Sequence, residues 1–188
     1  MLRFKVLSWE AFSDLAFRLW VKAYSDGFRP DLVVAILRGG YPIGLIVSNL
    51  YGVDVEALRI EHYHGRMRKK RAEIVQPLHA EVSGKQILLV DDVTDTGESL
   101  RLALNHLESR GASNVKTGTL HVKPGSRFIP NYYVEKTNAW IVYPWEIGDF
   151  IREFKEKMLR EGKNMEEVFE ALRRFGFKDD VLSMLLRV

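Results

Sequence analysis

Residues 87–99, with the sequence ILLVDDVTDTGES, decide the fold. They begin with a short apolar run, which is typical of a strand buried on both faces of a parallel sheet. Two acids follow at once, and hydroxyl residues and a glycine then lead into residues 97–110, whose apolar spacing predicts a helix that ends at Gly111. A strand, a loop and a helix in this order belong to a βαβ unit, and such sheets bind their ligands beyond the carboxyl ends of the strands.

The rest of the chain continues this alternation. Strands are expected at residues 32–37, 53–60, 86–90 and 115–122, and helices at 8–25, 43–51, 150–161, 165–175 and 179–186. Ser8 is the expected N-cap of the first helix, and Gly27 lies just past its end. We therefore expect an α/β domain over residues 1–147, built on a mainly parallel twisted sheet flanked by helices, and a C-terminal helical extension over residues 148–188.

Composition excludes several classes of protein. The 188 residues include 28 Lys and Arg against 25 Asp and Glu, a net charge of +3 that is too small for a chain whose main task is to coat nucleic acid. The absence of cysteine excludes disulfides, zinc-finger spacings and thiol catalysis, and the five histidines lack metal-binding spacing. Because the longest apolar stretch is only strand-sized and the N-terminus lacks the apolar run of a signal peptide, we expect a cytoplasmic protein.

The loop after residue 90 combines groups that suit a phosphorylated sugar. Backbone N–H groups at a helix start, together with Thr94, Thr96 and Ser99, suit a phosphate monoester. Asp91 and Asp92 could hold ribose hydroxyls and a hydrated Mg²⁺. Two other interpretations are an acidic turn that only caps a helix and a response-regulator receiver domain, although receivers carry their acidic pair near the start of the chain.

Two segments resemble known substrate loops. Residues 90–99 resemble the phosphoribosyl pyrophosphate (PRPP) signature of type I phosphoribosyltransferases, and residues 35–44, AILRGGYPIG, resemble the pyrophosphate loop of the same family. Gly39 and Gly40 would let the backbone approach an anion closely, and Arg38 would supply forked donors for phosphate oxygens. The resemblance also implies a non-proline cis peptide near Leu37 and Arg38.

Two later segments resemble the base site of xanthine-guanine phosphoribosyltransferases. They are Lys123-Pro124-Gly125 and residues 140–147, WIVYPWEI. The resemblance implies that Lys123 donates to the purine 6-oxo group, that Trp140 stacks on the ring, and that the carbonyls of Ile141 and Glu146 meet the exocyclic 2-substituent. A lysine donor favours 6-oxo over 6-amino purines, because adenine would present a donor to a donor. Related enzymes have Asp where this chain has Glu146, so the choice between guanine, xanthine and hypoxanthine stays open.

The function that the resemblance implies is transfer of the 5-phosphoribosyl group from PRPP to a 6-oxopurine, which yields the nucleoside monophosphate and pyrophosphate in purine salvage. Asp95 would be the general base, and Asp91 and Asp92 would hold Mg²⁺. The residues expected to bind PRPP are Arg38, Gly39, Gly40, Asp91, Asp92, Thr94, Asp95, Thr96, Gly97, Glu98 and Ser99, and those expected to bind the base are Lys123, Trp140, Ile141 and Glu146.

The polar residues 61–83 predict a long loop, and the resemblance makes it a flexible hood that closes over the substrate. One or two cations of its basic run, Arg66, Arg68, Lys69, Lys70 and Arg71, are expected to meet pyrophosphate. The same run sustains an alternative function, a PRPP-sensing regulator of this fold that binds nucleic acid. A phosphoribosyltransferase for another base is a further alternative.

The C-terminal extension carries an apolar stripe that must be covered. Its residues are Met165, Val168, Phe169, Leu172 and Phe175. Either this chain or another copy could cover it. The resemblance implies a homo-oligomer, and we expect neither a membrane nor nucleic acid as a partner.

Overall fold

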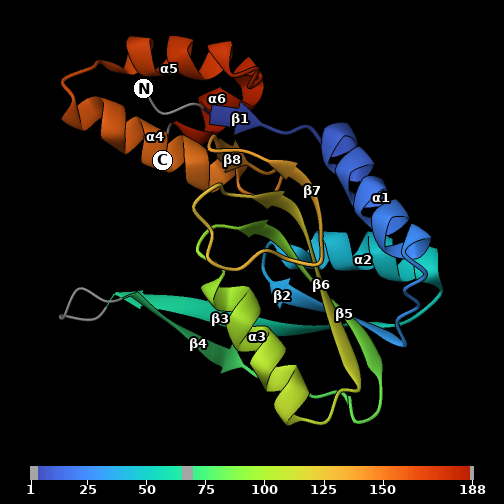
Figure 1. The fold of residues 1–188 in the computed structure, drawn as a ribbon. Helices are drawn as coiled ribbons and strands as arrows, with labels where there is room; N and C mark the ends of the chain where they lie inside the picture. The colour runs from blue at the N-terminus through green and yellow to red at the C-terminus, as the bar shows by residue number, and fades with distance from the viewer. Residues whose placement is uncertain (1–3, 65–69, 187–188) are drawn as a thin grey trace. The chain divides into compact units, whose positions relative to one another are not determined.

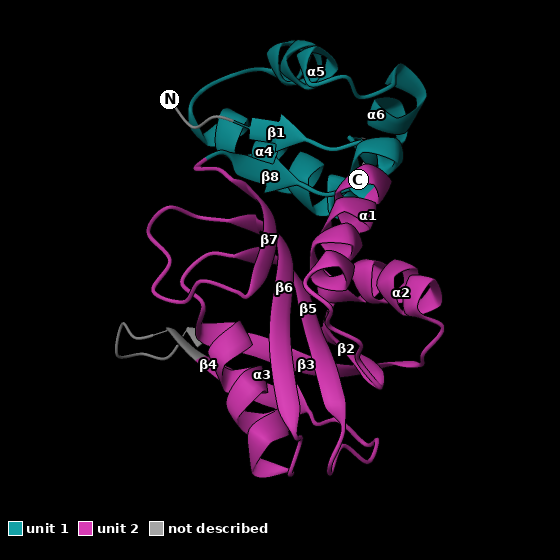
Figure 2. Ribbon diagram, turned by 45° about the vertical axis from the view of Figure 1, so that its right-hand side comes forward, with its two compact units in different colours: residues 1–12, 139–188 teal, residues 13–138 magenta. Residues whose placement is uncertain are grey.

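The computed structural model describes residues 4–64 and 70–186, which form two compact units. Residues 13–138 form one of them, here termed the sheet unit, and residues 1–12 together with 139–188 form the other, termed the helical unit (Figure 2). The helical unit therefore contains more than the expected extension over residues 148–188, because it includes residues 139–147 and an N-terminal segment.

A six-stranded sheet forms the centre of the sheet unit (Figure 1). The strand order is β4-β3-β2-β5-β6-β7, and every neighbouring pair is parallel except β3 and β4. The strands are β2 (Leu32–Leu37), β3 (Val55–His64), β4 (Lys70–Gln76), β5 (Gln86–Thr94), β6 (Asn114–Val122) and β7 (Tyr132–Lys136). The mainly parallel sheet expected from the alternating pattern is confirmed.

Helices cover both faces of this sheet because its central strands are apolar on both sides. The helices are α1 (Trp9–Ser25), of which residues 13–25 belong to the sheet unit, α2 (Gly40–Tyr51) and α3 (Glu98–Ser109). Strand β2 has no alternation of buried and exposed positions, since its residues 32–36 are all buried. On one face Val34 and Ile36 pack with Leu100 of α3. On the opposite face, a Cβ on Gly44 of α2 would lie 3.0 Å from the Cβ of Ala35.

The first helix begins where its sequence predicts. The Ser8 hydroxyl accepts a hydrogen bond from the backbone N–H of Ala11 at 3.1 Å, which is the N-cap interaction. Gly27 has a φ of 78°, so it occupies the left-handed region after the helix end.

The expectation of a long loop over residues 61–83 is wrong for residues 61–64 and 70–76, which are strands, whereas residues 77–83 lie outside any helix or strand. Beyond Arg59, where the register shifts, β3 pairs with β4, and the two strands form an antiparallel hairpin that we term the arm. Its inner face carries Ile60, Ala72 and Ile74, which pack against the apolar cluster around α3. The many charged residues at the other positions of β3 and β4 obscured this alternation in the sequence. Of the basic run, Arg66, Arg68 and Lys69 lie outside the described residues, as do the side chains of Lys70 and Arg71.

The described part of the helical unit contains a two-stranded parallel sheet, three complete helices and the start of α1. Its elements are β1 (Phe4–Val6), β8 (Trp140–Val142), α4 (Ile147–Arg160), α5 (Met165–Arg174) and α6 (Asp179–Leu185). The short strands β1, β7 and β8 were not expected, since three to five residues give little periodic signal. Within residues 4–64 and 70–186, no helix is both long and apolar enough to cross a membrane.

This chain covers its own C-terminal apolar stripe. Val168 and Leu172 of α5 are fully buried, and they share a cluster with Phe150 and Ile151 of α4 and with Leu182 of α6. Phe4 of β1 adds edge-to-face contacts, such as that with Phe150 at a centroid distance of 5.2 Å. Of the two coverings left open by the sequence, the chain itself is therefore the correct one for this stripe except at Met165, which is 40% exposed.

Candidate active site

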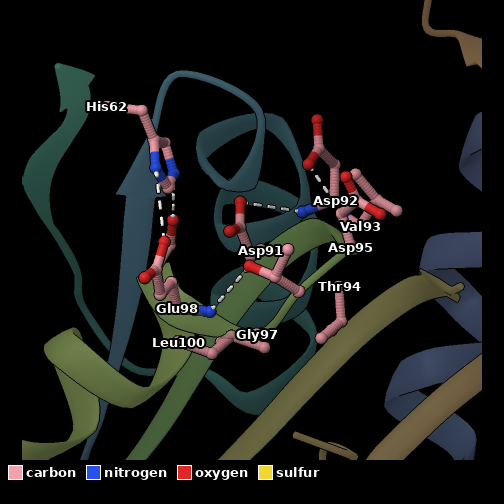
Figure 3. A pocket seen from close by; sticks show the side chains of 11 residues that line it. His62, Asp91, Asp92, Val93, Thr94, Asp95, Gly97, Glu98 and Leu100 are labelled. Atoms are coloured by element: carbon pink, nitrogen blue, oxygen red, sulfur yellow. Dashed lines mark hydrogen bonds and ion pairs between the residues drawn. The ribbon is translucent and has the colours of Figure 1, made fainter. Parts of the chain in front are cut away.

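A pocket opens at the carboxyl end of β5, where the sequence predicts the ligand site. Its volume is ≈ 380 Å³, and its lining consists of His62 from the arm and the continuous run from Asp91 to Leu100 (Figure 3). The run leaves the central strand of the sheet, turns, and enters α3. One continuous segment thus supplies an acidic pair, a hydroxyl-rich loop and a helix start around a single space.

The acidic pair is held against its own backbone. The Asp91 carboxylate accepts a hydrogen bond from the Asp92 N–H at 3.0 Å, and the Asp92 carboxylate accepts one from the Val93 N–H at 2.7 Å. Each residue is only 9% exposed. Burial, and then the neighbouring charge of Asp92, raise the pKa of Asp91 well above its ordinary value, while the bond from the Asp92 N–H opposes the shift.

Two adjacent, poorly solvated carboxylates suit a hard divalent cation. Among the described residues, no cluster of three or more His, Asp or Glu side chains could hold a metal ion. Magnesium does not need one, because it binds through one or two carboxylates, keeps several waters and takes further oxygens from substrate phosphates. The carboxylates of Asp91 and Asp92 are therefore suitable ligands for Mg²⁺.

The loop from Thr94 to Ser99 is fixed by glycine geometry and by hydroxyl groups. Gly97 has a φ of 87°, and a Cβ at this position would lie 2.3 Å from the Cβ of Phe128, so only glycine fits. The Thr96 hydroxyl accepts a hydrogen bond from the Glu98 N–H at 3.3 Å. Thr94 is buried and donates to the Thr119 hydroxyl at 3.3 Å, so its side chain braces the loop from the sheet.

The loop that resembles a pyrophosphate loop lies directly against the acidic pair. A Cβ on Gly39 would lie 1.9 Å from Oδ2 of Asp92, and one on Gly40 would lie 2.5 Å from the carbonyl oxygen of Val90. The peptide bond between Leu37 and Arg38 is cis, as the resemblance implies. The structure thus brings together two segments that are about fifty residues apart in the sequence.

Two further site candidates are Asp95, which belongs to the loop from Thr94 to Ser99, and Lys123, which lies beside that loop. The backbone N–H of Lys123, directly after β6, donates to the carbonyl of Thr94 at 2.9 Å. Burial lowers the pKa of Lys123, and the charge of Asp95 acts in the opposite direction. Asp95 is itself exposed. The charge of Asp95 therefore acts on Lys123 within the sheet unit.

The remaining residues of the expected base site belong to the helical unit. Trp140 begins β8 and is 54% exposed, whereas Ile141 is buried. Glu146 is the N-cap residue of α4, and its carbonyl accepts from the Phe150 N–H at 2.8 Å. The nearby Trp145 is partly buried and stacks on the buried Tyr143 with a centroid distance of 5.0 Å.

Sequence reasoning missed His62 and Phe128. His62 lines the pocket, and Phe128 packs against Gly97. A signal for His62 was present, because it lies two residues after the buried Ile60 and therefore on the same face of its strand. Phe128 had no such signal, since it lies outside any helix or strand.

Comparison with known proteins agrees with this geometry. Residues 5–149 match the family described as the phosphoribosyl transferase domain. The chain belongs to this family. A hypoxanthine-guanine phosphoribosyltransferase from Lactococcus lactis is 33% identical over 113 residues, which cover 57% of this chain and 61% of that protein's length.

Solved structures share the fold. A purine phosphoribosyltransferase from Pyrococcus horikoshii has a TM-score of 0.69 and 29% identity, covering 76% of this chain and 93% of that chain. A xanthine-guanine-hypoxanthine phosphoribosyltransferase from Helicobacter pylori has a TM-score of 0.68 and 20% identity, covering 82% of this chain and 99% of that chain. At 20% identity, this second likeness shows a shared fold alone.

Proposed function

We propose that this protein transfers the 5-phosphoribosyl group of PRPP to a 6-oxopurine and releases pyrophosphate, as an enzyme of purine salvage. The proposal rests on the arrangement of three elements at the carboxyl end of β5. There the acidic pair Asp91 and Asp92 and the hydroxyl loop line one pocket, and the Arg38–Gly40 turn packs directly against the acidic pair. PRPP carries a monoester phosphate, ribose hydroxyls and a pyrophosphate, so each of the three elements has a chemical counterpart on this substrate.

The leaving pyrophosphate gains negative charge as the C1–O bond of ribose breaks. Arg38 and the backbone of Gly39 would stabilise this charge, because fixed donors aimed at developing charge lower the barrier. Magnesium bound at Asp91 and Asp92 would supply further positive charge for the same oxygens. Main-chain N–H groups at the start of α3, with Thr96 and Ser99, would bind the 5′-phosphate.

The purine nitrogen that attacks C1 must lose a proton. Asp95 is exposed at the pocket and would act as the general base. Lys123 would donate to the 6-oxo group, and Trp140, Ile141 and Glu146 would contribute to the selection of the base. Burial lowers the pKa of Lys123, so the site disfavours an unpaired lysine charge and rewards a hydrogen-bond acceptor beside it.

The test is product formation from PRPP and Mg²⁺ with guanine, xanthine, hypoxanthine, adenine or orotate, each supplied alone and read by chromatography of the nucleotide. The expected result is nucleotide from at least one 6-oxopurine and none from adenine. If no base reacted while PRPP still bound, the protein would act as a PRPP-binding regulator, and a gel shift at low salt would be the next measurement.

We also propose that the protein works in the cytoplasm as a homo-oligomer. The sheet unit exposes large apolar side chains on two helices, with Phe17 46%, Val21 50% and Leu45 48% exposed. No residue of α2 (Gly40–Tyr51) is charged, which is unusual for an exposed helix and suits a contact between copies. Light scattering should therefore give a multiple of 21.7 kDa, and Leu45→Lys should shift the mass toward a single chain.

A further inference from the structure

His62 joins the arm to the loop that would bind the sugar phosphate. It lies on β3, two residues after Ile60, and side chains two apart on a strand share a face. Ile60 is buried in the cluster that includes Leu100 of α3. His62 therefore faces the first turn of α3, and it lines the pocket (Figure 3).

Both ring nitrogens of His62 have partners in that turn. Nε2 lies 2.9 Å from the Ser99 hydroxyl oxygen, and Nδ1 lies 3.9 Å from a carboxylate oxygen of Glu98. These are the two contacts drawn for His62 in Figure 3. Apolar packing also holds the arm to α3, and His62 adds a polar link between the arm and the phosphate loop.

The chemistry of the two contacts determines what Ser99 can do. If Nε2 carries a proton, it donates to the Ser99 oxygen, and the hydroxyl hydrogen is then available to a phosphate oxygen. If Nε2 is bare, the hydroxyl donates to the ring instead and is lost to the ligand. An imidazolium satisfies both contacts, because Nδ1–H faces the Glu98 carboxylate while Nε2–H faces Ser99.

The charges around the phosphate loop also favour this role for His62. The Glu98 carboxylate lies in the lining of a pocket that would receive a phosphate dianion, and the two negative charges repel each other. A protonated His62 ring would offset part of this repulsion through its contact with Glu98. The contribution that the geometry shows directly is an oriented Ser99 hydroxyl.

We propose that His62 is a positioning residue for the 5′-phosphate, which acts through Ser99 and couples the arm to occupancy of the phosphate loop. This inference rests on the proposed function, because it assumes a sugar phosphate as the ligand. The ligand class is a phosphate monoester. Pyrophosphate would bind at the Arg38–Gly40 turn, whose residues do not line the pocket that His62 lines.

The experiment measures the Kd of ribose 5-phosphate and of magnesium pyrophosphate by calorimetry on the full chain. The variants are His62→Ala, His62→Gln, Ser99→Ala and the double variant His62→Ala/Ser99→Ala. His79→Ala is the matched control, since His79 is another exposed histidine of the sheet unit but does not line the pocket.

The expected loss for His62→Ala is about tenfold in affinity for ribose 5-phosphate, the usual weight of a hydrogen bond that serves a charged group. Pyrophosphate affinity should stay unchanged. Gln keeps a hydrogen-bond donor at this position, so His62→Gln should retain part of the affinity that His62→Ala loses. Because His62 acts through Ser99, the double variant should lose little more than Ser99→Ala alone.

Three results would overturn the inference. Equal binding of ribose 5-phosphate by wild type and His62→Ala would remove the role, as would a loss of the same size for both ligands, which would indicate a general disturbance of the arm. Additive losses in the double variant would remove the route through Ser99. Failure of the wild-type protein to bind ribose 5-phosphate would overturn the proposed function as well, and this outcome is separate from the other three.

Discussion

Gly40→Ala tests whether the Arg38–Gly40 turn must lie directly against the central strand. Gly40 is buried at the start of α2, and an added Cβ would lie 2.5 Å from the carbonyl oxygen of Val90 and 3.1 Å from the Asp91 Cα. Ordinary van der Waals contact begins at 3.4 Å, so the first distance is too short by almost an ångström. Val90 pairs with Ala35 on one side and with Gly118 on the other, so the strand cannot retreat and the turn must move.

The free energy of unfolding should fall by about 1–2 kcal/mol in this variant. Overpacking in a well-packed region costs about 1–3 kcal/mol. Replacing glycine by alanine restricts the unfolded chain and returns about 0.4–1 kcal/mol, which applies here because Gly40 does not have a positive φ. Since 1 kcal/mol shifts the Tm of a chain of this size by about 2–4 °C, the expected decrease is about 2–8 °C.

The effect on turnover should be larger than the effect on stability. A displacement of about 1 Å in a positioning loop can cost about 100-fold in rate. The measurements are thermal unfolding and initial rates with saturating PRPP. Gly125→Ala is the control for the Tm, because its Cβ would meet nothing within 4 Å and its φ is not positive. If Gly40→Ala matched this control in Tm and the wild type in rate, the close approach of the turn to β5 would be refuted.

Three other changes probe separate parts of the site and fold. Asp91→Asn should raise the Tm of the ligand-free protein, because it removes a buried charge beside Asp92, and it should abolish PRPP turnover, because the substrate complex needs that charge. Calorimetry measures the Tm and a rate assay measures the turnover. A lower Tm would contradict the prediction. Asp95→Asn should reduce kcat by about 10²–10⁴-fold while the KM for PRPP changes little, and an unchanged kcat would exclude Asp95 as the general base. Burial and a 2.7 Å hydrogen bond to Asp26 raise the pKa of Tyr132, so its phenol stays protonated in the folded state above the ordinary tyrosine pKa of about 10. That stabilisation is complete below about pH 10 and is lost as the pH rises further, so Tyr132→Phe should flatten the alkaline decline of stability in chemical denaturation, and an identical decline would count against it.

Local patterns were sufficient for the central strands and most helices. The expected strand at residues 32–37 has the bounds of β2, since an unbroken apolar run suits only a strand buried on both faces. The helix at Met165–Arg174 was expected to within one residue. The arm was misread as a loop because its apolar face is small and becomes visible only when it packs on α3. Edge strands such as β7 depend on a neighbour for their hydrogen bonds rather than on their own pattern.

The candidate site, like the fold, could be predicted from the sequence only in part. The acidic pair and the phosphate loop are continuous in sequence, so residues 91–99 could be identified from residue type and order alone. The contact of Gly39 with Asp92 and the contact of His62 with Ser99 each join residues far apart in the chain. Parallel pairing of β2 beside β5 creates the first contact, and the packing of the antiparallel arm on α3 creates the second. The sequence by itself therefore determined the chemical groups of the continuous run that lines the pocket, whereas tertiary packing added His62 and decided which groups meet, because strand order and register are properties of the assembled sheet.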